Sequence, residues 1–443
     1  MNSDDSKISL FESPLNYSLQ DENNIVTSSG EAKATLNSNY LTVVPDIGES
    51  IVFSYIDILG IAEEDYKINL FLTSKEKLTL FHLGYRYEDF LRAIFRRRNE
   101  LFLKYLLMDE RLRESDIEAE FALFDENAEE LHGGSCELRL YETALLILPQ
   151  KGEPTRIPFS DIVGAREEDY RFIIELEKGD KLVLSQMGEK FDFFRRSLSK
   201  AMNELSFKVQ SLVKELLPVA DPIKTRKLAF LLREGRAAKR ADISSISPEF
   251  WEILEARLEA SGSKEEYDFL KNMSQDEQIC IGIKRGLMGD LTGDYIWFLI
   301  PIYSTNSMEE GNAIAMEAIS EGDTGRATYF FRMLSRRDYP HYNNLDHLHR
   351  EFDAFIRKIN RCMIEINFRR EPIYLTKKRL TDPQYEKYRF AIQRLPSLQD
   401  LRNHFIGRVI HTSPEQWKKD VMDLLKFNVS IEEDSMKWMK GLV

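Results

Sequence analysis

The chain has 443 residues, of which 43% are apolar and 11% aromatic, and its formal net charge is −13. This amount of apolar material excludes a mainly disordered protein, and the length predicts two to four domains. The acidic charge argues against nucleic acid as a partner and disfavours binding to an anionic membrane, unless basic residues are gathered locally.

The first part of the chain combines a polar leader with an internal repeat. Residues 1–30 are acidic and rich in serine and asparagine, so we expect a disordered, mobile tail. When residues 45–101 are aligned on residues 149–205 without a gap, 20 of 57 positions are identical. The stretch DILGIAEEDY at 57–66 returns as DIVGAREEDY at 161–170. Such self-similarity predicts one structural unit that occurs twice, at an offset of 104 residues.

Each copy changes its hydrophobic period partway along. Apolar residues alternate at Ile68, Leu70 and Leu72, which is typical of a half-buried strand. After Gly84 the apolar spacing becomes helical. Within the repeated stretch, Gly60 predicts a bulge, and the following Glu-Glu-Asp predicts a polar hairpin tip that ends where Tyr66 opens the next strand. The two acidic tips could also form a paired cation or partner site, but they lack the oxygen ligands that a calcium loop needs.

The pattern of strands, then IPFSDIVG at 157–164, KLVL at 181–184 and a closing helix resembles the pleckstrin-homology-like (PH-like) superfold. The GRAM-type, bacterial and histone-chaperone versions are the most similar. The resemblance implies two tandem β-sandwich or barrel domains, residues 31–115 and 134–209, each closed by a C-terminal helix. Such domains bind lipids, peptides or proteins and are not enzymes. The loops 36–40 and 140–143 contain no lysine or arginine, which argues against binding of inositol phosphates.

The helix predicted at the end of the first copy carries the most basic local cluster of the chain. It consists of Arg92, Arg96, Arg97, Arg98 and Lys104. These side chains are the candidates for binding an anion, a membrane surface or a protein partner. The alternative interpretation is an ordinary solvated helix face.

The second half of the chain predicts a helical segment at 210–275 and then a return to strands. Asp221 followed by Pro222 is typical of a helix start. Four strand candidates and one helix occupy 276–370, and the last part, 371–443, is predicted to be helical. The helix near 355–366 shares five of twelve positions with the helix of the first copy, so 276–370 is a possible divergent third copy.

No motif in the sequence identifies an active site, a cofactor site or a metal site. The glycine-rich stretch 286–295 lacks the Gly-Lys-Ser/Thr end of a phosphate-binding loop. His341, Asp346, His347 and His349 are the only group that hints at zinc, and we interpret them as polar residues at a helix start. Three isolated cysteines, with neither a signal peptide nor a long apolar run, favour a cytoplasmic protein.

Together these features predict a multi-domain α+β protein: two PH-like domains, a helical linker and a C-terminal α+β region. The expected function is a non-enzymatic cytoplasmic scaffold of bacterial type that binds a protein or peptide, without cofactors. Exposed strand edges and the cleft between the two copies are the expected binding sites. One alternative is peripheral membrane binding through the basic helix. The second is an enzymatic or metal-binding activity within residues 210–443.

Overall fold

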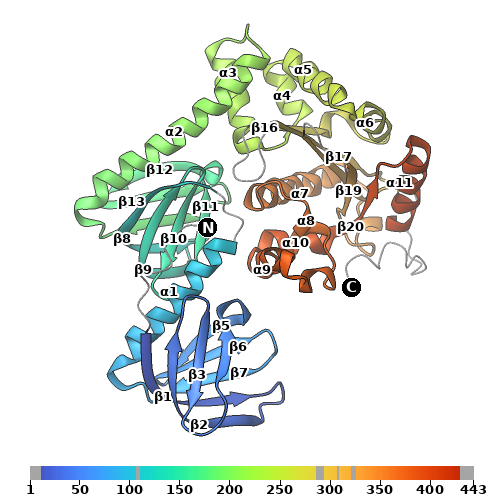
Figure 1. The fold of residues 1–443 in the computed structure, drawn as a ribbon. Coiled ribbons are helices and arrows are strands. Elements are labelled where there is room, and N and C mark those ends of the chain that lie inside the picture. Colours follow the sequence, from blue (N-terminus) through green and yellow to red (C-terminus); the bar gives the residue numbers. More distant parts are fainter. Residues whose placement is uncertain (1–10, 106–109, 286–293, 307–308, 321–325, 430–443) are drawn as a thin grey trace. The chain divides into compact units, whose positions relative to one another are not determined.

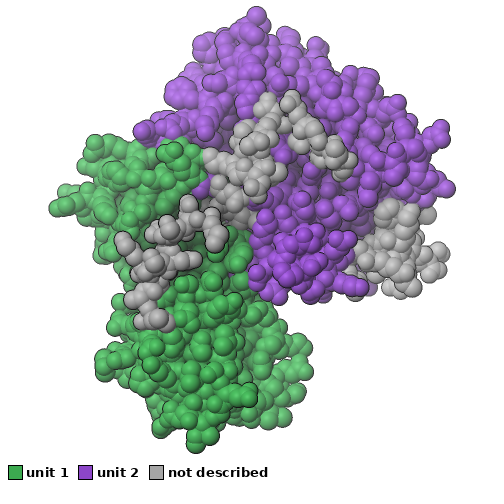
Figure 2. All heavy atoms as spheres, viewed as in Figure 1, with its two compact units in different colours: residues 1–105, 111–198 green, residues 106–110, 199–443 purple. Residues whose placement is uncertain are grey.

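The computed structural model describes residues 11–105, 110–285, 294–306, 309–320 and 326–429. The chain divides into two compact units, which Figure 2 colours green and purple. The first unit comprises residues 1–105 and 111–198, and the second comprises residues 106–110 and 199–443. No helix of the described ranges is long and apolar enough to cross a membrane.

The first unit contains two modules of the same design, each a seven-stranded antiparallel sheet followed by a helix (Figure 1). Module 1 consists of β1 (Phe11–Gln20), β2 (Val26–Leu36), β3 (Tyr40–Pro45), β4 (Ile51–Ser54), β5 (Ile58–Glu64), β6 (Lys67–Leu72), β7 (Lys77–Phe81) and α1 (Tyr87–Tyr105). Module 2 consists of β8 (Leu112–Phe124), β9 (Glu130–Tyr141), β10 (Ala144–Pro149), β11 (Thr155–Pro158), β12 (Ile162–Glu168), β13 (Arg171–Leu176), β14 (Lys181–Ser185) and α2 (Phe191–Leu216).

The strand order is the same in the two modules. It is β4-β3-β2-β1-β7-β6-β5 in module 1 and β11-β10-β9-β8-β14-β13-β12 in module 2. Both copies are seven-stranded antiparallel sheets followed by a helix, so the predicted fold class of α+β with two like domains, each closed by a C-terminal helix, is confirmed.

Residues 11–30 form β1 and the start of β2, so the prediction of a disordered tail over residues 1–30 is wrong for the described part. In β1, Leu15, Tyr17 and Leu19 are buried, and the residues between them are partly exposed. This two-residue period is typical of a half-buried strand. The polar residues around these three positions make the period difficult to recognise in the sequence. Because β1 pairs with both β2 and β7, module 1 needs this strand.

Module 2 begins at β8, which corrects its predicted start at residue 134. Ile117, Ala119 and Phe121 of β8 are buried at alternate positions, and the strand pairs with both β9 and β14. The offset of 104 residues carries β1 onto β8. The structural repeat therefore includes the strand before the region of clear sequence identity in each copy.

The ten-residue stretch that occurs twice, at 57–66 and 161–170, forms a bulged hairpin in each module. β5 begins at Ile58 and its register shifts before Gly60, so the predicted bulge is confirmed. Asp65 and Tyr66 have φ values of 47° and 56°, and β6 begins only at Lys67. Two positive φ values are what a two-residue hairpin turn of type I′ requires, so the tyrosine lies in the turn and not in the next strand. The equivalent residues of module 2 repeat the bulge and the turn.

The second unit is built around a six-stranded antiparallel sheet with helices on both faces (Figure 1). Its strands are β15 (Ala238–Lys239), β16 (Cys280–Arg285), β17 (Asp294–Ile302), β18 (Ala313–Ser320), β19 (Ala327–Arg332) and β20 (Phe405–Ile410). Its helices are α3 (Pro222–Leu231), α4 (Arg240–Ile246), α5 (Pro248–Leu258), α6 (Lys264–Lys271), α7 (Leu345–Glu365), α8 (Glu371–Tyr374), α9 (Glu386–Arg394), α10 (Pro396–His404) and α11 (Pro414–Val429). The four predicted strands are confirmed, whereas β20 corrects the prediction that 371–443 is entirely helical.

Both faces of this sheet are buried because its central strands are apolar on both sides. In β17, Trp297 and Leu299 belong to the core shared with α7, α8, α9 and α10. Phe298 and Ile300 belong to the opposite core, shared with α3, α5, α6, α11 and the C-terminal end of α2. The indole Nε1 of Trp297 donates a hydrogen bond of 2.8 Å to the backbone oxygen of Gly235, so its polar atom is satisfied inside the core.

The second unit is not a third PH-like copy. Its strands pair in chain order from β15 to β20, whereas both PH-like sheets place their first strand in the middle. The helix that echoed module 1, α7, lies between β19 and β20 and does not follow the last strand. The similarity between the two helices reflects the amphipathic composition that any helix covering a sheet shares.

We predict that Gly282→Ala lowers the free energy of unfolding by about 2 to 3 kcal/mol, because an added Cβ would overpack the core. That Cβ would lie 2.8 Å from the backbone oxygen of Gly235 and 2.9 Å from the backbone nitrogen of Ala237. Gly60→Ala is the control, since its Cβ would contact only the ring of Phe71, at 3.8 Å. Urea unfolding followed by far-ultraviolet circular dichroism measures both variants, because all four tryptophans lie in the second unit and would not report on Gly60. Equal stability of the two variants would contradict the prediction.

Candidate functional site

The basic cluster predicted as a ligand site does lie on one helix, α1, but it does not form one exposed patch. Arg92, Arg96 and Lys104 are exposed. Arg97 and Arg98 are buried, with 8% and 1% of their surface exposed. The predicted five-residue site is therefore wrong in two of its members, because the C-terminal half of α1 is covered on more than one side.

Arg98 is buried because it satisfies backbone groups at the bulge of β5. Its guanidinium donates to the oxygen of Ile58, with Nε at 3.3 Å and Nη2 at 3.2 Å, and Nη2 donates to the oxygen of Leu59 at 3.2 Å. Nη2 also lies 2.9 Å from a carboxylate oxygen of Glu153, between β10 and β11. The guanidinium packs over the ring of Phe102 at 4.2 Å. This side chain is thus used to hold module 1 against module 2.

Other polar groups of α1 make the same joint between the modules. The side-chain amide of Asn99 donates to the backbone oxygen of Gly152 at 3.1 Å. Glu100 accepts two hydrogen bonds from Arg139 of β9, at 2.6 and 3.2 Å. A planar, two-point contact of this kind fixes orientation as well as distance. We call these contacts of α1 with module 2 the α1 joint.

The acidic hairpin tip of module 1 also has a partner within the protein. Lys151, in the loop after β10, lies 3.0 Å from the carboxylate of Glu63 and 3.2 Å from that of Glu88. Glu63 therefore pairs with a lysine of module 2, which supports the interpretation of this tip as structural. Sequence reasoning missed the α1 joint because its two arginines are not repeated: Arg98 aligns with Met202, and Arg139 aligns with Thr35.

We predict that Arg98→Met destabilises the first unit by about 1 to 3 kcal/mol, because it removes a donor to the buried carbonyl oxygen of Ile58 and the ion pair with the half-exposed Glu153. The same change at the exposed Arg96 should alter stability by less than about 0.5 kcal/mol. Urea unfolding of the two variants, both Arg→Met on one helix, provides the comparison. Similar destabilisation by both would contradict the role assigned to Arg98.

The histidine group considered for zinc does not converge on one point. His341 ends a short helical turn (Tyr339–His341), and Asp346, His347 and His349 lie in the first turns of α7. The ring of His347 packs near that of Tyr342, and the ring of His349 packs near that of Tyr303. Within the described ranges, no three or more histidine, cysteine or carboxylate side chains are placed to hold a metal ion.

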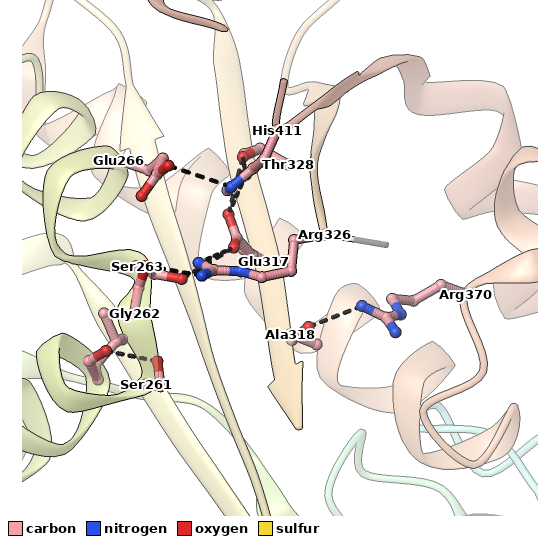
Figure 3. A network of polar contacts seen from close by, with 11 residues as sticks. Ser261, Gly262, Ser263, Glu266, Glu317, Ala318, Arg326, Thr328, Arg370 and His411 are labelled. Atoms are coloured by element: carbon pink, nitrogen blue, oxygen red, sulfur yellow. Dashed lines mark hydrogen bonds and ion pairs between the residues drawn. The ribbon is translucent and has the colours of Figure 1, made fainter. Parts of the chain in front are cut away.

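A buried charged network joins β18 and β19 of the second unit's sheet to α6 and to the residue after β20 (Figure 3). Its centre is Glu317 of β18, which is 1% exposed. One carboxylate oxygen accepts from Ser263 at 3.1 Å and from Arg326 at 3.0 Å. The other accepts from Thr328 at 2.9 Å and lies 3.1 Å from Nε2 of His411. Every lone pair of this carboxylate therefore faces a donor, as burial of a charge requires.

His411 carries a positive charge in this network. Its Nδ1 lies 3.3 Å from a carboxylate oxygen of Glu266 on α6. Burial alone lowers the pKa of the imidazole, but hydrogen bonds and charges from Glu266 and Glu317 outweigh burial and raise the pKa to about 9. Two cations, Arg326 and His411, thus balance two carboxylates inside the protein.

The network contains the elements of a nucleophile and base, but it does not fit that chemistry. The hydroxyl oxygen of Thr328 lies 3.1 Å from Nε2 of His411, which in turn contacts Glu266. Thr328 is fully buried, so no substrate reaches its hydroxyl, which already donates to Glu317. A protonated imidazole also cannot accept the hydroxyl proton. The arrangement is suited to locking α6, β18, β19 and the end of β20 together.

The raised pKa of His411 predicts that stability depends on pH. The unfolded value is 6.5 and the folded value is about 9, so the contribution of the charged form is complete below pH 6.5 and is lost as pH rises through 9. We expect the stability difference between the wild type and His411→Gln to shrink between pH 6.5 and pH 9. Urea unfolding at a series of pH values measures this difference. Curves that stay parallel would contradict a charged histidine.

An open apolar surface lies on the outer side of β3 and β4 in module 1. Tyr40, Val44 and Val52 are 48%, 41% and 58% exposed there. Val52 is opposite Thr42 in the ladder, and Val44 is opposite Lys33 of β2, so these side chains share one face of the sheet. We call this surface, with the loop residue Ile47, the module 1 face.

The equivalent surface of module 2 is more buried, although Val52 corresponds to Arg156, which is partly exposed. Tyr40 and Val44 correspond to Ala144 and Leu148, which are 0% and 7% exposed. The neighbouring outward residue of β10, Leu146, is also buried, and it is opposite Arg139, the partner of Glu100. The α1 joint therefore lies over the surface that stays open in module 1.

Comparisons with known proteins add a likeness to solved structures. The sequence matches no family model and no curated protein. Among solved structures, a chain described as "Structure of the Spt16D Pob3N heterodimer" aligns with 38% of this chain and 84% of that chain, at 14% identity and a TM-score of 0.17. The likeness of the two modules to each other is shown by their strand order and their closing helices.

Proposed function

We propose that the chain is a non-enzymatic cytoplasmic adaptor whose tandem PH-like modules bind a protein partner, and that the partner docks on the module 1 face. One observation carries this proposal. The two modules differ at this surface: Tyr40 and Val44 are exposed in module 1, and their counterparts Ala144 and Leu148 are buried in module 2. Exposed apolar residues that share one face mark interaction surfaces more often than isolated ones do.

Strand addition is the binding mode that this surface favours. β4 is the end strand in the order of its sheet and pairs with β3 on one side. A partner strand that pairs with its free edge would place side chains beside Val52 and Tyr40. The cleft between the copies, the other expected site, is the less suitable of the two because the α1 joint occupies it.

The membrane alternative is weakened by the burial of Arg97 and Arg98. The exposed cations of α1 that remain, Arg92, Arg96 and Lys104, are four and eight residues apart, and Glu100 lies between the last two. Three cations on one helix face attract an anionic surface only weakly. The charged network of the second unit does not support the enzymatic alternative, because Glu317 and Thr328 are buried.

We predict that Val52→Asp reduces recovery of the partner at least tenfold, because a carboxylate would have to be buried against the docking strand. A photo-crosslinking residue at Tyr40 captures the partner from lysate, and mass spectrometry identifies and quantifies it. Val163→Asp is the matched control, since Val163 is 54% exposed on β12, an end strand of module 2. Equal recovery with both variants, or no captured protein, would overturn the proposal. Flotation of the wild type with anionic vesicles tests the membrane alternative separately.

A further inference from the structure

A second apolar groove lies in the other unit, on the outer side of α3. It measures about 530 Å³ and lies between α3 and the end of α4. Its lining consists of Ile223, Arg226, Lys227, Phe230, Leu231 and Ile246. This groove is independent of the PH-like modules and goes beyond the function proposed for them.

The position of the groove follows from the two faces of α3. Asp221 caps the helix by accepting hydrogen bonds from the backbone nitrogens of residues 223 and 224, and Pro222 occupies the first turn, so the predicted helix start is confirmed. Leu228 and Leu232 point into the core of the unit. The groove-lining residues of α3 stand at i, i+3, i+4, i+7 and i+8, which is the stripe that a helix presents to a neighbouring helix.

The stripe keeps large apolar side chains exposed. Ile223 is 59% exposed and Phe230 is 60% exposed, one at each end of the stripe. Ile246 of α4 forms the opposite wall and is partly buried, as is Leu231. The surface is thus a shallow, open groove with exposed apolar groups at both ends and a partly buried apolar wall. An elongated, open groove suits the apolar face of a helix.

The centre of the stripe is basic. Arg226 and Lys227 lie between the two apolar ends, are exposed, and form no ion pair with any described residue. Arg233 lies 4.1 Å from the centre of the Phe230 ring and adds positive charge beside the groove. Among the nearby acids, Asp221 is engaged in the helix cap and Glu249 accepts from Ser247 at 2.7 Å. Arg226 and Lys227 are therefore cations of the groove that have no counterion among the described residues.

We propose that this groove binds an amphipathic helix of a partner protein that carries carboxylates in the middle of its apolar face. Apolar residues one turn to either side would contact Ile223 and Phe230, and the carboxylates would pair with Arg226 and Lys227. Recognition by anchors at i, i+3, i+4 and i+7 is the usual way in which a helix enters a groove. Complementary charge then selects acidic helices and rejects basic ones.

The test uses the full chain and two fluorescein-labelled helical peptides of about five turns. Both carry leucines at the flanking anchor positions, and they differ only in having two glutamates or two lysines at the central positions. The acidic peptide should bind the wild type about tenfold or more tightly than the lysine peptide does, as measured by fluorescence anisotropy. The double variant Arg226→Glu with Lys227→Glu should reverse this preference.

A matched control separates the groove from net charge. Lys377→Glu with Lys378→Glu makes the same charge change at two exposed lysines of the same unit, and it should leave the peptide preference unchanged. The proposal is overturned if neither peptide binds, if both bind the wild type equally, or if the control has the same effect as the groove variant. It is also overturned if the wild type floats with vesicles of phosphatidylcholine and phosphatidylserine and the groove variant does not.

Discussion

The buried guanidinium of Arg98 is the constraint on which the first unit depends. A charge that is 1% exposed is tolerated only when its N–H groups are bonded and a counterion is close. The bulge of β5 supplies two carbonyl oxygens, and Glu153 of module 2 supplies the carboxylate. Because these groups come from both modules, a shift of either module would leave a buried charge unpaired. Electrostatics thus fixes one arrangement of two modules that hydrophobic burial alone would leave adjustable.

This joint is head-to-tail, and a head-to-tail contact between like modules always leaves one copy of the contacted surface unused. The end of α1 meets β9 and the β10–β11 loop of module 2, where Gly152 and Arg139 receive it. The equivalent strands of module 1 carry Tyr40, Val44 and Val52 in the open. Duplication therefore explains both the common fold of the modules and the difference between their surfaces. The module 1 face is apolar and is not covered by a helix equivalent to α1, so it is the surface on which we expect a partner to bind.

The features of the fold that could be predicted are those that appear as a periodic spacing of apolar residues within one segment of the sequence. Alternating apolar residues predict most strands, and the change of period after Gly84 predicts α1. β1 carries the same signal in Leu15, Tyr17 and Leu19, but the polar composition of residues 1–30 favours the prediction of disorder. The charged network could not, because its members come from α6, β18, β19 and the end of β20. Its one sequence signal is Glu317, a single carboxylate within an otherwise apolar strand. Contacts between segments that are distant in the sequence produce no periodic spacing of residues from which they could be predicted.

The net charge of the chain favours a basic partner, whereas the charge of its α3 groove favours an acidic one. Screening of charges by salt determines which of the two affects binding at the groove. A total of −13 favours basic partners, whereas the groove carries unpaired Arg226 and Lys227. At physiological salt the field of exposed charges falls off over about 8 Å, so a docking side chain responds mainly to groups within that distance. Carboxylates elsewhere on the chain therefore contribute to solubility and little to recognition at α3. The same reasoning applies to α1. Because Arg97 and Arg98 are buried, the exposed positive charge of this helix is smaller than its sequence suggests, whatever the net charge of the chain. For this chain, exposure has to be established residue by residue before charge can be used to infer a partner.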